Sequence, residues 1–197
     1  MAEALVVLGA YLLGSMPFGY WIVLLLKHED IRKVGSGNIG ATNVWRTYGK
    51  QYGIPIVVLD AAKGFVPALV GTLVANEVVG ALAGGAAMLG HWRPLFLRFQ
   101  KGGKTVATAG GTFFGVAPFV GLVGLGIWIA TFVVTRYASL ASIVTACALP
   151  FVALALDAPW PVIVFAALAG VAVLLLHKGN IARLRAGTES RFRLRRA

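Results

Sequence analysis

The sequence predicts an all-α, polytopic integral membrane protein with seven transmembrane helices. Composition is the first reason, because 58% of the 197 residues are hydrophobic and only 13% are charged. Charged residues make up roughly a quarter of an ordinary soluble domain. Patterning is the second reason, because the apolar residues gather in long runs that short basic segments separate. A chain with this pattern requires lipid rather than water around its helices.

The apolar runs mark the expected helices. A helix that spans a bilayer needs about 20 predominantly apolar residues. The expected spans are, in chain order, 4–26, 54–75, 78–92, 105–116, 119–135, 140–156 and 161–176. Gly14, Pro17 and Gly19 interrupt the first of them. Two spans are short, which is acceptable for helices that other parts of the protein surround.

The basic residues decide the number of spans and their orientation. Lys and Arg collect on the cytoplasmic side of membrane proteins. With seven spans, an outside N-terminus and a cytoplasmic C-terminus, every Lys and Arg except Lys63 lies on that side. With six spans, either Arg136 or the basic tail after His177 lies on the wrong side. The net charge of +11 therefore reflects membrane topology, and we expect no nucleic-acid partner.

We expect residues 1–197 to form a single membrane-embedded domain with three polar segments, 35–46, 101–108 and 177–189, on its cytoplasmic side. No long internal repeat is visible, which argues against a transporter built from duplicated halves. No residues have the spacing of metal ligands, and the Gly-x-Ser-x-Gly nucleophile motif is absent. The sequence therefore predicts no metal and no cofactor.

The first polar segment begins GSGNIGATN at residues 35–43. Its glycines let backbone N–H groups turn toward a ligand, and successive N–H groups form a concave anion site. A helix that starts near Ala41 would point its first amides the same way. Side-chain hydrogen-bonding groups come from Ser36, Asn38, Thr42 and Asn43. The segment predicts a phosphate-binding loop, and a plain flexible turn is the alternative.

The other two segments add basic side chains. Residues 101–108 read KGGKTVAT, and lysines around two glycines suit either phosphate or the start of a span on the positive side. Residues 177–184 read HKGNIARL, so His177, Asn180 and Arg183 share a face if this stretch is helical. These side chains suit a phosphorylated alcohol, and a basic chain end at the membrane surface is the alternative.

Two charged residues, Asp60 and Lys63, lie inside an expected span, three positions apart. Ionisable residues within a membrane are candidates for a functional site. An internal ion pair that offsets the cost of burial explains them equally well. Both interpretations stay open at this point.

Together, residues 35–43, 101–108 and 177–189 resemble the three signature segments of the bacterial membrane acyl-phosphate-dependent glycerol-3-phosphate acyltransferases. The resemblance covers nearly the whole chain and departs at Thr105, where the family commonly has glycine. It implies a multi-pass enzyme of the bacterial inner membrane whose active site faces the cytoplasm. The enzyme would transfer a fatty acyl group from acyl phosphate to the sn-1 hydroxyl of glycerol 3-phosphate. The products would be lysophosphatidic acid and phosphate, in the first step of phospholipid synthesis.

The resemblance also implies roles for individual residues. The residues that would bind acyl phosphate are Ser36, Gly37, Asn38, Gly40, Thr42 and Asn43. Those that would bind glycerol 3-phosphate are Arg46, Lys104, Ser142, His177 and Asn180. Catalysis would involve Ser36, Lys104, His177 and Asn180. The expected partners are the two substrates and membrane lipids, and the sequence carries no prediction of the oligomeric state.

Physical chemistry is consistent with this division of roles. The donor is an activated mixed anhydride, so alignment and amides that face the developing oxyanion suffice without an enzyme nucleophile. The base that takes the hydroxyl proton is either His177 or the donor phosphate. A small membrane anion channel or transporter is the alternative function. It requires a polar path on both faces, but the expected outer loops, 76–77, 117–118 and 157–160, are minimal.

Overall fold

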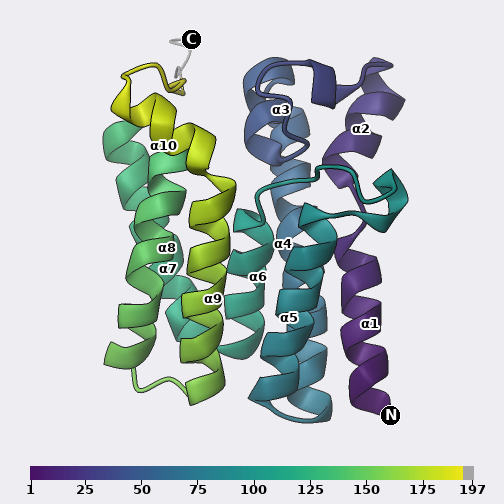
Figure 1. The fold of residues 1–197 in the computed structure, drawn as a ribbon, viewed down its shortest axis with the longest axis vertical. Coiled ribbons are helices and arrows are strands. Elements are labelled where there is room, and N and C mark those ends of the chain that lie inside the picture. Colours follow the sequence, from purple (N-terminus) through teal and green to yellow (C-terminus); the bar gives the residue numbers. More distant parts are fainter. Residues whose placement is uncertain (193–197) are drawn as a thin grey trace. The chain divides into compact units, whose positions relative to one another are not determined.

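A computed structural model describes residues 1–192, and every regular element within them is a helix (Figure 1). The chain forms two compact units, Met1–Pro118 and Phe119–Ala197. Unit 1 contains α1 (Ala2–Gly14), α2 (Phe18–Lys27), η1 (Ile31–Lys33), α3 (Ala41–Tyr48), α4 (Lys50–Val74), α5 (Glu77–Trp92), η2 (Leu95–Leu97) and α6 (Val106–Val116). Unit 2 contains α7 (Pro118–Thr135), α8 (Ala138–Ala155), α9 (Trp160–Leu176) and α10 (Lys178–Arg185).

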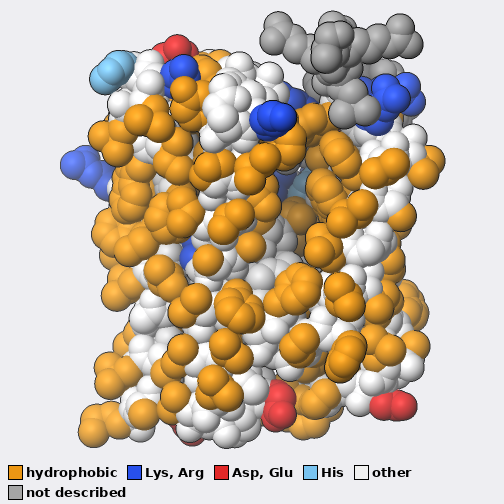
Figure 2. All heavy atoms as spheres, turned by 180° about the vertical axis from the view of Figure 1, so that it is seen from behind, with side chains coloured by type: hydrophobic (Ala, Val, Ile, Leu, Met, Phe, Trp, Pro, Cys, Tyr) orange, Lys and Arg blue, Asp and Glu red, His pale blue; other side chains and the backbone are white. Residues whose placement is uncertain are grey.

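Several of these helices have the length and composition of membrane spans. Four stretches qualify, namely Ala2–Lys27 (α1 with α2), α4, α7 and α8. The pair α9 and α10, bent by 61°, makes a fifth if it counts as one span. Hydrophobic side chains cover much of the face in Figure 2, as lipid-facing helices require. The all-α membrane class is therefore confirmed, whereas the seven spans and the side of each terminus stay predictions.

Small residues let the helices of unit 1 pack backbone against backbone. A side chain at Gly14 of α1 would collide with the carbonyl group of Ala87 in α5. One at Gly64 of α4 would collide with the carbonyl group of Thr108 in α6, and Gly111 of α6 lies equally close to α4. Such close approach is typical of helix packing in membranes. It holds α6, and hence the end of the second polar segment, directly against α4.

Within unit 1, the first two polar segments lie at the same end. The helices α1 and α5 run toward this end, and α4 and α6 run away from it (Figure 1). The first segment leads into α3, and the second connects η2 with α6. Their common position follows from the alternating direction of the helices, as the sequence predicts.

Within unit 2, the third polar segment lies beside the turn between α7 and α8 (Figure 1). The Phe192 N–H donates a hydrogen bond to the Arg136 carbonyl oxygen at 2.9 Å. The Phe192 ring also meets the Phe132 ring edge-on, with 5.2 Å between centroids. These contacts attach the chain after α10 to the α7–α8 turn.

Candidate active site

The first polar segment is a loop that the Asn43 side chain holds in shape. This side chain is 4% exposed, and its Oδ1 accepts a hydrogen bond from the Ser36 N–H at 2.9 Å. Its Nδ2 donates to the carbonyl oxygens of Val34 at 3.0 Å and Asn38 at 2.9 Å. Both amide hydrogens are therefore used inside the loop. Asn43 shapes the segment from within, a role that its sequence position alone does not reveal.

Glycines bend the same loop and lead it into a helix. Gly35 and Gly37 have φ angles of 61° and 68°, in the left-handed region that glycine adopts without steric cost. The Gly40 N–H donates to Oδ1 of Asn38 at 2.8 Å. Helix α3 then starts at Ala41, which confirms the predicted helix start. Backbone N–H groups at a helix start attract anions.

Three predicted phosphate ligands lie in this loop or in the helix that follows it. Ser36 and Thr42 are exposed, and Arg46 is half-buried. Arg46 lies on α3, three residues beyond Asn43, so the two share a face of that helix. Two exposed hydroxyl-bearing residues and an arginine of α3 therefore lie in this loop or just after it.

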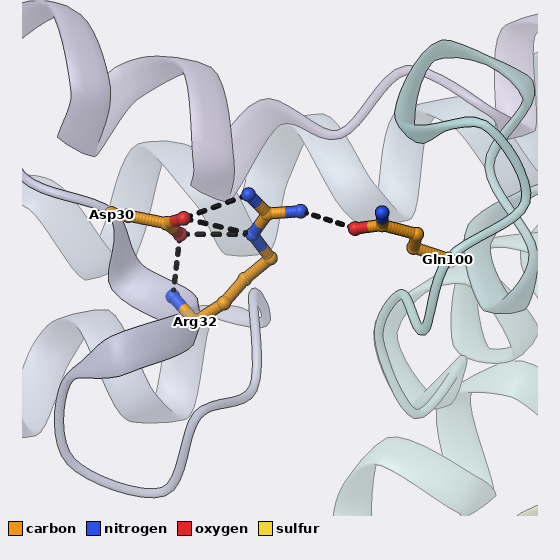
Figure 3. Close-up of polar contacts among 3 residues, drawn as sticks. All are labelled: Asp30, Arg32 and Gln100. Atoms are coloured by element: carbon orange, nitrogen blue, oxygen red, sulfur yellow. Dashed lines mark hydrogen bonds and ion pairs between the residues drawn. The ribbon is translucent and has the colours of Figure 1, made fainter.

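Arg32 lies between α2 and the first polar segment, and it contacts the loop that precedes the second segment. Figure 3 shows its guanidinium group between Asp30 and Gln100. Arg32 Nη2 lies 2.7 Å from Asp30 Oδ2, and Nη1 donates to Gln100 Oε1 at 2.7 Å. The hydrogen bonds from Arg32 hold the pKa of Asp30 below its usual value, and the same contact raises the pKa of Arg32. The contact joins the chain after α2 to the chain after α5.

The second polar segment is attached to the end of α5. The Gly102 N–H donates to the Trp92 carbonyl oxygen at 2.9 Å, and the Gly103 N–H donates to that of His91 at 3.0 Å. A side chain at Gly102 would collide with the His91 carbonyl oxygen, and one at Gly103 would collide with the His91 imidazole ring. Glycine is required at both positions by space. Lys104 follows directly and is half-buried.

Thr105, the residue directly before α6, has a strained conformation. Its φ is 62° and its ψ is 2°, a left-handed geometry that is rare for a β-branched residue. The residue is 2% exposed, and its Oγ1 has no hydrogen-bond partner within residues 1–192. The left-handed geometry gives a physical reason why glycine suits this position, where the sequence departs from the resembled family.

In the third segment, His177 occupies the bend between α9 and α10. It is 3% exposed, and its Nδ1 lies 2.8 Å from the Val173 carbonyl oxygen. Because a carbonyl oxygen only accepts, Nδ1 carries the hydrogen in this contact. The neutral ring therefore keeps its lone pair on Nε2. Nε2 is the atom suited to accept a hydrogen bond or a proton.

Glu189 accepts hydrogen bonds from three side chains of unit 2. Its Oε1 accepts from Ser139 Oγ and from Asn180 Nδ2, each at 2.6 Å, and its Oε2 accepts from Arg183 Nε at 2.7 Å. Burial raises the pKa of Glu189, but the hydrogen bonds from these three side chains outweigh burial and hold the pKa below its usual value. Asn180 and Arg183 thus share a face of α10, as their spacing predicts.

Ser142 has a different environment from the rest of its predicted group. Its Oγ donates to the Ala138 carbonyl oxygen at 2.8 Å and accepts from Trp128 Nε1 at 3.1 Å. The hydroxyl hydrogen is therefore used within α8, while the indole joins α7 to α8. One turn earlier, Ser139 contacts Glu189.

The structure thus groups the predicted residues by unit. Unit 1 contains Ser36, Gly37, Asn38, Gly40, Thr42, Asn43, Arg46 and Lys104, and unit 2 contains Ser142, His177 and Asn180. Sequence reasoning assigned no role to Glu189 and did not pair it with Ser139, which lies just after an expected cytoplasmic turn. The available signal was a single acidic residue within a basic chain end. The hydrogen bond between Ser139 and Glu189 could not be predicted from the sequence, because 50 residues separate the two.

The fold and these segments define a helical integral membrane protein with cationic, glycine-rich segments next to its helix ends. A family profile described as glycerol-3-phosphate acyltransferase matches residues 4–187. The chain belongs to this family of enzymes, and the predicted resemblance is confirmed.

Individual relatives agree with this assignment. A glycerol-3-phosphate acyltransferase of Geotalea daltonii is 45% identical over 98% of this chain and 98% of its own length. One of Aquifex aeolicus is 42% identical over 98% of this chain and 100% of its own length. The crystal structure of PlsY (YgiH), an integral membrane glycerol 3-phosphate acyltransferase, matches in its glycerol 3-phosphate form with a TM-score of 0.93, 42% identity and coverage of 98% and 96% of the two chains. Its lysophosphatidic acid form matches with a TM-score of 0.89.

Proposed function

We propose that this protein transfers a fatty acyl group from acyl phosphate to the sn-1 hydroxyl of glycerol 3-phosphate, releasing lysophosphatidic acid and phosphate. Family membership over residues 4–187 supports the acceptor and the reaction. The two forms of the PlsY structure, with glycerol 3-phosphate and with lysophosphatidic acid, agree with the acceptor and the product. The protein crosses the bacterial inner membrane seven times, with its N-terminus outside and its C-terminus and active site on the cytoplasmic side.

The first polar segment binds the phosphate of the acyl donor. Its support is the loop geometry, in which two left-handed glycines precede the first amides of α3. Because the N–H groups of Ser36, Gly37 and Gly40 donate within the loop, the first amides of α3 are the backbone donors for this anion. Ser36 and Thr42 add hydroxyl groups from exposed positions. Asn43 keeps the loop in this shape through its three hydrogen bonds.

Glycerol 3-phosphate is bound by basic residues and by the third segment. Arg46 and Lys104 provide positive charge for its phosphate, because guanidinium and ammonium groups are the usual phosphate donors of proteins. His177 and Asn180 orient the attacking hydroxyl. The single observation that carries this role is the His177 contact with Val173, which keeps Nε2 as the acceptor of the neutral ring.

The chemistry needs alignment more than activation. The hydroxyl oxygen attacks the carbonyl carbon of the mixed anhydride, and phosphate leaves with the bonding electrons of the carbon–oxygen bond that breaks. The proton of the hydroxyl passes to His177 or to the donor phosphate. We assign His177 mainly to positioning of the acceptor. Loss of turnover in a His177→Ala variant with unchanged glycerol 3-phosphate affinity would contradict that assignment.

The decisive experiment supplies purified protein with glycerol 3-phosphate and either palmitoyl phosphate or palmitoyl-CoA. We expect lysophosphatidic acid to form with palmitoyl phosphate and not with palmitoyl-CoA. Product from the CoA ester but not from the phosphate would refute the proposed donor. An anion channel, the alternative function, predicts phosphate flux in liposomes without acyl transfer, and the family assignment does not favour it.

A further inference from the structure

A buried polar cluster in unit 1 lies outside the set of residues that the proposed reaction uses. It consists of Asp60 and Lys63 on α4 and His91 on α5, which are 3%, 2% and 4% exposed. Lys63 Nζ lies 2.8 Å from Asp60 Oδ1, and His91 Nδ1 lies 3.6 Å from the same oxygen. Buried charges are costly within a membrane and usually mark function. An ion pair that served packing alone would be replaceable by apolar residues.

Each end of the cluster contacts a point where a helix is interrupted. At one end, Lys63 Nζ donates to the Met16 carbonyl oxygen at 3.0 Å, in the break between α1 and α2. At the other end, the His91 ring fills the space where a side chain at Gly103 would lie. The Gly103 N–H also donates to the His91 carbonyl oxygen. His91 therefore contacts the second polar segment through both its backbone and its ring.

The position of the His91 ring depends on Asp60. Among the described residues, the ring nitrogen nearest to Asp60, Nδ1, has no hydrogen-bond partner, and 3.6 Å is slightly beyond hydrogen-bond length. The carboxylate is thus the polar group that faces this nitrogen from α4, and Lys63 balances the charge of that carboxylate. A rotated ring would leave the contact with Gly103. The residue after Gly103 is Lys104.

From these contacts we infer that Asp60, Lys63 and His91 are positioning residues, which hold the Gly102–Gly103 turn and thereby set the Lys104 ammonium group for the phosphate of glycerol 3-phosphate. The inference rests on the proposed function, because it uses the assigned role of Lys104. The cluster acts through the turn and does not touch a substrate. It therefore affects binding of the acceptor and leaves binding of the acyl donor unchanged.

The test measures KM and kcat for both substrates in two variants and a control. His91→Ala removes the ring, and Asp60→Asn combined with Lys63→Met removes both charges while keeping side-chain size. We expect each to raise the KM for glycerol 3-phosphate by about tenfold or more, with the KM for acyl phosphate within about twofold of the unmodified protein. The control, Thr72→Ala, removes a partly buried hydroxyl group of α4 whose hydrogen bond goes to Ala68, and it should change neither constant.

Folding and function are separable in this design. The double variant, Asp60→Asn with Lys63→Met, is expected to accumulate in membranes at the level of the unmodified protein. The reason is that removing both charged partners leaves no unpaired charge. If His91→Ala does not accumulate, His91→Gln replaces it and should show the same selective rise. An unchanged KM for glycerol 3-phosphate in the double variant or in the His91 variant overturns the inference. Inactivity of the unmodified protein with both substrates would instead overturn the proposed function.

Discussion

The side-chain amide of Asn180 donates to the Glu189 carboxylate at 2.6 Å, from the first turn of α10 to the chain that follows this helix. Ser139 and Arg183 bind the same carboxylate. One acidic residue therefore determines the orientation of Asn180, which the proposed mechanism places against the acceptor hydroxyl. This relationship makes Glu189 the most informative residue of unit 2 for experiment.

Glu189→Gln should destabilise the protein and lower its activity. The substitution replaces one carboxylate oxygen by an NH2 group, which then faces either Arg183 or the pair of Ser139 and Asn180 without accepting from them. An unmatched buried donor costs about 1–3 kcal/mol. The measurement is thermal unfolding in detergent together with kcat. The control is Glu3→Gln at an exposed position of α1, which should leave both unchanged. Equal stability of the two variants would contradict the described carboxylate network.

The same carboxylate predicts how stability depends on pH. The folded pKa of Glu189 lies below its ordinary value, so its contribution is fully present above the unfolded pKa and is lost as pH falls through the folded pKa. Stability of the unmodified protein should decrease below about pH 4.3, the usual value for Glu. Because Glu189→Gln has no such proton to bind, its stability should fall less over that range. Parallel pH profiles for the two proteins would exclude this contribution.

Thr105→Gly should stabilise the protein. The left-handed φ of 62° costs a residue with a Cβ atom about 1–2 kcal/mol, and glycine removes that cost together with the unpartnered Oγ1. Thermal unfolding is the measurement. Thr112→Gly is the matched control, because Thr112 lies in the regular part of α6, where glycine should destabilise by about 1 kcal/mol. A loss of stability in Thr105→Gly would contradict the described backbone geometry.

Asn43→Ala should selectively weaken binding of the acyl donor. Without the three hydrogen bonds of Asn43 the loop loses its shape, and we expect the KM for acyl phosphate to rise by about tenfold or more. Steady-state kinetics with both substrates provide the measurement. In the control Thr47→Ala, the lost hydroxyl bond goes to the Asn43 carbonyl from an exposed position, so the loop should persist. Equal effects of both variants would rule out the loop-shaping role.

The sequence was sufficient for the helices and insufficient for the contacts between them. Each predicted apolar run coincides with helical structure, and the glycine-rich stretch before Ala41 correctly indicated a helix start. Periodicity and glycine content are local, so they can be read along the chain. The 61° bend at His177 and the use of the Asn43 amide inside its own loop depend on spatial packing.

The chemistry of Asp60 and Lys63 illustrates the same limit. Their spacing left two interpretations open, a functional site and an internal ion pair, and the structure shows the ion pair at 2.8 Å. Their relation to His91 and Gly103 was not predictable, because it requires α4 and α5 to lie side by side with the second polar segment folded back on α5.

The central proposal is that the three polar segments lie on the cytoplasmic side of the membrane and bind two phosphorylated molecules. Single cysteines at Ser36, Lys101 and Asn180 test it most directly, in a Cys147→Ala background because the native cysteine is exposed. A membrane-impermeant thiol reagent is applied to sealed vesicles of known orientation. The proposal predicts labelling of all three positions from the cytoplasmic side only, and labelling of any one of them from the opposite side would contradict it.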